Sequence, residues 1–178
     1  MPVSLASSSA ASMHGALVPI TSAIAGAPST NVNFTNIPQT YQDLRIVLSI
    51  QNTAVIYDLF FALNGDFTGN SASRTLLSGD GSSASSSRRS NDSVIYMPMS
   101  SSSTAFTSFT IDVLNYTSTT QKTVLWRSAQ DLNGSGTTIL GVARKNTGAV
   151  TSLEINPNGG SFSTGSIFSI YGIRSVGQ

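Results

Sequence analysis

The sequence contains no cysteine, a single histidine and few charged residues among its 178 positions. The absence of cysteine excludes a disulfide framework, a thiolate zinc site and a cysteine nucleophile. Only 10% of the residues are charged, and the formal net charge is +1, whereas about 25% of the residues of a typical soluble protein are charged. Such a small net charge gives no electrostatic reason to expect nucleic acid or an anionic membrane as a partner.

Long apolar runs and targeting signals are also missing from the sequence. The first basic residue is Arg45, so the N-terminal region lacks the positive segment that begins a secretory signal. The apolar stretch 16–27 is interrupted by Pro19, Thr21 and Gly26, and it is too short to span a bilayer. We therefore expect a protein that is made in a cytoplasm and is used there or assembled into a larger particle.

What the sequence does contain is a large share of serine and threonine, roughly 50 residues, together with 39% hydrophobic residues. Wholesale disorder requires low hydrophobicity with high net charge, and neither condition holds here. The composition therefore indicates a folded protein that is polar, weakly charged and rich in β-structure.

Residues 1–33 form a segment without any charge, dominated by small residues and broken by prolines. Its larger apolar side chains include Val18, Ile20 and Ile24, and flexible linkers rarely carry such residues. Two alternatives stay open, a disordered tail and an extended N-terminal arm that is ordered against a neighbouring subunit. In the second alternative these three residues are the candidate subunit contacts.

From residue 34 onward the sequence shows short apolar runs, most of them with a two-residue period typical of half-buried strands. Phe109, Ile111 and Val113 fall on one face of such a run, and Trp126 is expected in the core. No segment keeps a helical period over ten residues. The predicted strands are Asp43–Ile50, Val55–Leu63, Arg74–Leu77, Ser93–Met99, Phe106–Asn115, Thr123–Ala129, Thr138–Lys145, Val150–Ile155 and Ser166–Ile173.

Asparagine and glycine, which tolerate the positive φ of tight turns, separate these runs. The longer polar stretches Gly79–Asn91 and Ser100–Thr104 consist largely of serine, glycine and alanine, and we expect surface loops there. Eight or nine short strands are typical of an antiparallel two-sheet sandwich, and a jelly roll has eight. The sequence therefore predicts an all-β, jelly-roll-like domain over residues 34–178, preceded by the arm.

The residues that could carry catalysis are sparse. His14, the only histidine, lies in the predicted arm, and a catalytic base needs rigid support. The eight acidic residues are dispersed, and Asp112, in the middle of an apolar strand, is expected on the solvent face. We therefore expect no enzyme, no catalytic residue and no cofactor.

Two polar motifs of the sequence are candidates for binding sites. The segment Asn64–Asn70 is rich in oxygen-bearing side chains but lacks the spacing of a calcium loop, so a plain hairpin loop is favoured and no metal site is predicted. Arg88 and Arg89 are the only adjacent basic pair. Nucleic-acid binding usually needs more bases interleaved with aromatic residues. We expect this pair at a loop tip, either solvated or in polar contact with a neighbouring chain.

The segment Gly160–Ile173 has the pattern G-x-F-x-x-G-S-x-x-x-x-Y-G-I. Further segments of interest are Phe34–Leu48, the turn Asn64-Gly65-Asp66, Asn115-Tyr116, Thr119–Thr123 and Asn146–Leu153. Together the segments cover about half of the chain. They resemble tailed-bacteriophage virion proteins of jelly-roll type, which often end on a pattern similar to that of Gly160–Ile173.

The resemblance implies a structural protein of the virion. It implies first a capsid cement or decoration protein, commonly a homotrimer, that binds the major capsid protein or other virion proteins and stabilises the lattice. A tail or tail-fibre component that takes part in host attachment is one alternative, and a carbohydrate-binding jelly-roll module is another. The expected location is the virion, assembled in the host cytoplasm, without contact to nucleic acid or membrane.

Overall fold

The computed structural model describes residues 17–54, 58–99, 104–130, 136–145 and 148–174. Over these ranges the chain is all-β, and none of the described segments forms a helix long and apolar enough to cross a membrane. The strands found there are β1 (Leu17–Ile24), β2 (Val32–Phe34), β3 (Asp43–Ile50), β4 (Asp58–Leu63), β5 (Ala72–Gly79), β6 (Ala84–Asp92), β7 (Ile95–Pro98), β8 (Thr107–Leu114), β9 (Lys122–Gln130), β10 (Thr137–Lys145), β11 (Leu153–Pro157) and β12 (Ile167–Ile173).

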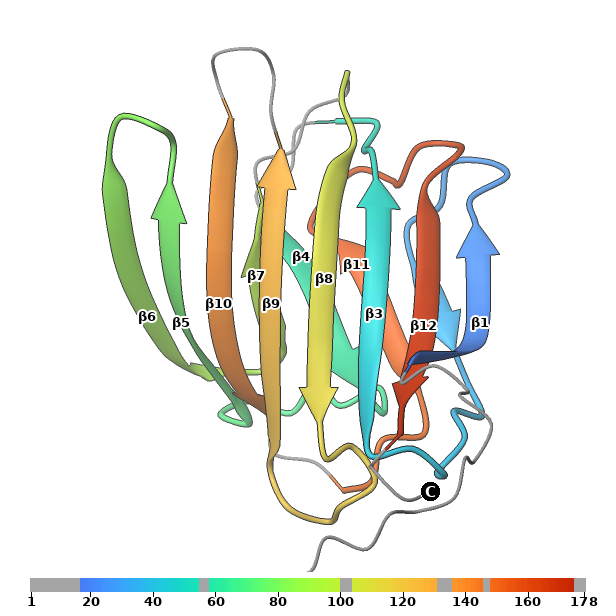
Figure 1. Cartoon of the computed structure of the whole chain (residues 1–178). Helices are drawn as coiled ribbons and strands as arrows, with labels where there is room; N and C mark the ends of the chain where they lie inside the picture. The colour runs from blue at the N-terminus through green and yellow to red at the C-terminus, as the bar shows by residue number, and fades with distance from the viewer. Residues whose placement is uncertain (1–16, 55–57, 100–103, 131–135, 146–147, 175–178) are drawn as a thin grey trace, which may run out of the picture.

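The described strands form two antiparallel sheets that pack as layers (Figure 1). The large sheet has eight strands in the order β1-β12-β3-β8-β9-β10-β5-β6, and the small sheet has four in the order β2-β11-β4-β7. In Figure 1 the large sheet lies in front and the small sheet behind it. The hydrophobic core fills the space between the two layers, with side chains from both sheets.

The strand order is that of a jelly roll with two additional hairpins. When β5–β6 and β9–β10 are set aside, the remaining strands, renumbered from 1 to 8 in chain order, run 1-8-3-6 in one sheet and 2-7-4-5 in the other. This is the double Greek-key order of a jelly roll. The predicted fold class is therefore confirmed. Both hairpins extend the large sheet beyond β8 and widen one face of the molecule.

Side-chain alternation along the strands explains why these segments pair as they do. In β9, every second residue from Lys122 to Gln130 is buried and the intervening residues are exposed. Phe109, Ile111 and Val113 of β8 are fully buried, and Trp126 is 1% exposed, as the sequence predicts. A strand with this pattern buries one face against the small sheet and leaves the other uncovered.

Each of the nine predicted strand regions overlaps an observed strand, but the loop predicted over Gly79–Asn91 is wrong. Residues Ala84–Asp92 form β6, which pairs with β5 along its length and is the edge of the large sheet. Every side chain of β6 before Asp92 is exposed, so this strand has no buried face and no apolar alternation to reveal it. Hydrogen bonding to β5 holds it in place. Most of the second predicted loop, Ser100–Thr104, lies outside the described residues.

Part of the segment predicted as the N-terminal arm, residues 17–33, contributes two strands to the sandwich. β1 pairs with β12 from Leu17 to Ile24, and β2 pairs with β11. A register shift between Pro19 and Thr21 accommodates the proline, which is tolerated in an edge strand. The remainder of the predicted arm, residues 1–16 with His14, lies outside the described residues.

Several turns form where the sequence predicts them. Asn64 and Gly65 both adopt positive φ, 56° and 60°, directly after β4. The Asn64 side chain then accepts hydrogen bonds from the backbone N–H groups of Thr151 (2.8 Å) and Ser152 (3.2 Å). This turn therefore ties the end of β4 to the segment that leads into β11. Gly165, just before β12, has a φ of 89°.

Candidate docking surface

The face of the eight-stranded sheet that points away from the small sheet is called the outer face. It is turned toward the viewer in Figure 1. Strand spacing and length give an eight-stranded face of this kind an area of about 1,000 Å², whereas a standard protein–protein interface buries about 800 Å² per partner. The outer face is therefore large enough for one stable interface.

Four aliphatic side chains form a contiguous apolar patch on the outer face. Leu140 lies directly opposite Leu77 of β5, and Val142 lies directly opposite Leu125 of β9. Leu140 and Val142 are two residues apart on β10 and so share one face. The four side chains are 40–56% exposed. Single exposed aliphatic residues are ordinary, but a contiguous group on a flat sheet is typical of an interaction surface.

An ion pair and a hollow lie beside the apolar patch. The guanidinium of Arg45 on β3 donates to both carboxylate oxygens of Asp112 on β8, at 2.7 and 2.9 Å. The hydrogen bond to Asp112 raises the pKa of Arg45. The hollow, of about 210 Å³, is lined by this pair together with Thr110, Leu125, Arg127, Leu140 and part of Trp126. As predicted, Asp112 lies on the outer face; its carboxylate is held by Arg45.

Arg88 and Arg89 are not at a loop tip, because both belong to strand β6. Their side chains alternate. Arg88 is opposite Thr75, whose side chain is exposed on the outer face, whereas Arg89 is opposite the buried Arg74 and lies on the side that faces the small sheet. Arg89 donates to Asp92 at 2.9 Å, and its guanidinium carbon lies 4.5 Å from the centre of the Tyr96 ring. Arg89 therefore fastens the added hairpin to β7, and only Arg88 is left for a neighbouring chain.

The three apolar residues predicted as contacts to a neighbouring subunit have different surroundings. Ile20 is half-buried and packs against the core of its own chain. Val18 is half-buried on the same side of β1. Ile24 is 68% exposed and lies directly opposite the exposed Ile167 of β12. Of the three, Ile24 is the most exposed.

Two buried lysines, which sequence reasoning missed, anchor the loops at one end of the added hairpins. Lys122 and Lys145 lie directly opposite each other on β9 and β10, and neither is exposed. The Lys145 ammonium donates to the Ser71 hydroxyl (2.6 Å) and the Ser93 carbonyl (2.7 Å). It also pairs with the Asp66 carboxylate at 3.2 Å. Burial lowers the pKa of Lys122. A lysine at a strand end gives no sequence signal for such an interior role.

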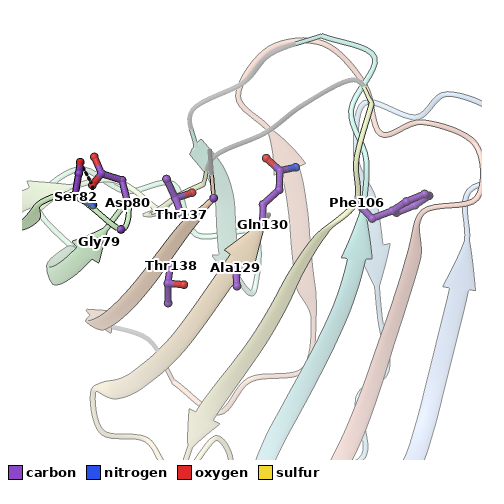
Figure 2. A pocket seen from close by; sticks show the side chains of 10 residues that line it. Gly79, Asp80, Ser82, Phe106, Ala129, Gln130, Thr137 and Thr138 are labelled. Atoms are coloured by element: carbon purple, nitrogen blue, oxygen red, sulfur yellow. Dashed lines mark hydrogen bonds between the residues drawn. The ribbon is translucent and has the colours of Figure 1, made fainter. Parts of the chain in front are cut away.

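The opposite end of the large sheet carries an open concavity between the β5–β6 turn and the adjoining ends of β8, β9 and β10 (Figure 2). The carboxylate of Asp80 is already used there, because it accepts hydrogen bonds from the backbone and hydroxyl groups of Ser82 and Ser83. Figure 2 shows the Phe106 ring pointing away from Asp80. The labelled side chains therefore do not converge on a common centre.

Two carboxylates make the stability of the fold sensitive to acid. Hydrogen bonds from Ser83 and Ser82 lower the pKa of Asp80 far below its ordinary value. Burial alone would raise the pKa of Asp66, but hydrogen bonds from Thr68 and the charge of Lys145 outweigh it and lower that pKa. A carboxylate with a lowered folded-state pKa stabilises the fold above its unfolded pKa of about 3.9, and this stability is lost as the pH falls toward the folded value.

We therefore expect the urea midpoint of unfolding to stay level between about pH 7 and pH 5 and to fall below about pH 4. The variant Asp80→Asn keeps an acceptor for the turn but has no titrating group, so its midpoint should fall less steeply in acid. If the urea midpoints of the variant and of the unaltered chain fell equally steeply with decreasing pH, the role given to Asp80 would be contradicted.

Comparisons of the chain with protein-family models, with curated proteins and with solved structures found no match.

Proposed function

We propose that the chain is a structural subunit of a tailed-phage virion, and specifically a cement or decoration protein that binds the lattice of major capsid protein. The observation that carries this proposal is the outer face, which is wide, uncovered by any described segment and marked by the contiguous patch Leu77, Leu125, Leu140 and Val142. A protein that works by holding other subunits together needs a surface of this kind.

The fold and the sequence resemblance are two further observations that support the same proposal. Jelly rolls occur in viral capsid domains and in lectins, and a fold by itself does not define a function. The two added hairpins, however, widen only the large sheet. A widened face with an exposed apolar patch suits docking on a broad lattice better than it suits holding a small ligand.

The proposal includes a homotrimer that is located in the virion, with the major capsid protein or other virion proteins as partners. It gives the chain no catalytic step and no contact with nucleic acid or membrane. The native mass of the purified protein tests the trimer, because a mass three times that of the chain is expected. A stable monomer at assembly concentrations would contradict it.

The test of the function uses virions from the genome that encodes the chain, compared with virions from which its gene has been deleted. We expect many copies per virion, in a fixed ratio to the major capsid protein, as measured by quantitative mass spectrometry. Virions without the chain should release their contents at a lower temperature, because binding stabilises the lattice by mass action. A few copies confined to the tail would favour the tail component instead. A melting temperature that rises with a sugar, without any binding to capsids, would favour the carbohydrate-binding module.

A further inference from the structure

We propose that the outer face docks on an acidic protein surface that carries apolar side chains, and that it does not dock on the same face of a second copy of this chain. The inference rests on the proposed function and adds the chemistry of the partner to it.

Three exposed arginines of the outer face form no ion pair with a carboxylate of the described residues. Arg88, Arg127 and Arg144 are all exposed, and none of them forms an ion pair with any acidic group in the described ranges 17–54, 58–99, 104–130, 136–145 and 148–174. Arg144 donates only to the neutral side chain of Gln121, at 3.2 Å. This part of the face is therefore positively charged, although the chain as a whole is almost neutral.

The arginines border the apolar patch. Arg127 lies directly opposite Leu140, and Arg144 follows Val142 by two residues on the same face of β10. Arg88 lies directly opposite Thr75, which in turn lies opposite Val142. A partner that covers the patch therefore also covers the guanidinium groups or places them at the rim of the interface.

Covering an arginine is costly unless a carboxylate accompanies it, because a charge without a partner loses its hydration. In the described strands of the large sheet, the outer face of a second copy offers only the carboxylates of Asp43 and Asp112, and both already have partners. Asp112 is held by Arg45, and Asp43 accepts the backbone N–H of Asn115 at 2.6 Å. The matching carboxylates must therefore come from a different surface.

The aliphatic character of the patch favours a protein over nucleic acid as the partner. Single-stranded nucleic acid is held by aromatic side chains that stack on the bases. Among the described residues of β5, β6, β9 and β10, no aromatic side chain alternates onto the outer face. Leucine and valine beside arginine match a protein surface with its own apolar side chains and carboxylates.

The test uses capsid shells from virions that lack the chain, and it measures binding of the full chain by co-sedimentation over a range of salt concentrations. The variant with Arg88→Gln, Arg127→Gln and Arg144→Gln is expected to bind about thirtyfold more weakly and to depend less on salt. Arg174→Gln, an exposed arginine beyond the end of β12, is the matched control and should bind normally. Shells whose carboxylates have been amidated should lose binding to the unaltered chain.

The outcomes separate the inference from the proposed function. If the unaltered chain does not bind shells, the proposed function fails and the inference fails with it. If the chain binds but the triple variant binds equally well, the proposed function stands and the inference that the partner surface is acidic is wrong. Binding of the unaltered chain to double-stranded DNA or to phosphatidylglycerol vesicles, with the same dependence on the arginines, would also overturn the inference. The inference would also be overturned if the triple variant changed only the oligomeric state of the chain.

Discussion

Replacing Gly141 with alanine is expected to lower the free energy of unfolding by about 3 kcal/mol, near the upper end of the usual cost of overpacking a core. A Cβ atom at this position would lie 2.1 Å from Cζ2 of Trp126 and 2.3 Å from its Cε2. The Trp126 ring is 1% exposed and lies directly opposite Gly141 on the neighbouring strand. It is enclosed by the core and cannot withdraw, so the backbone of β9 and β10 must move. Urea unfolding measures the loss.

Gly69→Ala is the matched control, because a Cβ atom there meets nothing within 4 Å. Its free energy of unfolding should change by no more than about 0.5 kcal/mol. The double variant Gly141→Ala with Trp126→Phe tests the cause, because the smaller ring makes room for the added Cβ atom. The double variant should lose less free energy of unfolding than the sum of the two single losses, by about 1 kcal/mol or more. A Gly141→Ala chain as stable as the unaltered chain would show that Trp126 does not occupy this position.

Changing Leu140 to aspartate is expected to weaken binding to capsid shells by at least about a hundredfold while the protein stays folded. Leu140 is 55% exposed and lies within the apolar patch, so a carboxylate there is hydrated in the free protein. In the complex it would be desolvated and would face the carboxylates of the proposed partner. Co-sedimentation measures the binding, and the urea midpoint confirms the fold.

Phe67→Asp provides the comparison for that experiment. Phe67 is 46% exposed and lies in the loop between β4 and β5, outside the strands that form the outer face. This variant should bind shells as the unaltered chain does. Equal binding by all three proteins would mean that the apolar patch is not the contact surface.

Strands with one buried face could be predicted from the sequence, and strands held mainly by backbone pairing could not. β3 and β8 alternate clearly between buried and less buried residues, and their predicted ranges match closely. β6 is serine-rich and exposed on both faces, so no period reveals it. β1 contains Pro19, which argues against a strand until its edge position and register shift are known.

The candidate surface could be predicted only in part, because it depends on register. The sequence shows that β10 is apolar on both faces, with Ile139 on one side and Leu140 and Val142 on the other. It does not show that the second side is left uncovered, nor that Leu77 and Leu125 are brought beside it. That Arg88, Arg127 and Arg144 form no ion pair within the described part of the chain is likewise a property of the assembled sheet.

The most direct test of the account is a cryo-electron microscopy density map of the native virion with the chain placed in it. We expect the outer face of the large sheet to lie against the capsid lattice, with Leu140 covered and Arg127 beside carboxylates of the neighbouring protein. A map in which the chain is bound through another surface, with the outer face open to solvent, would contradict the account.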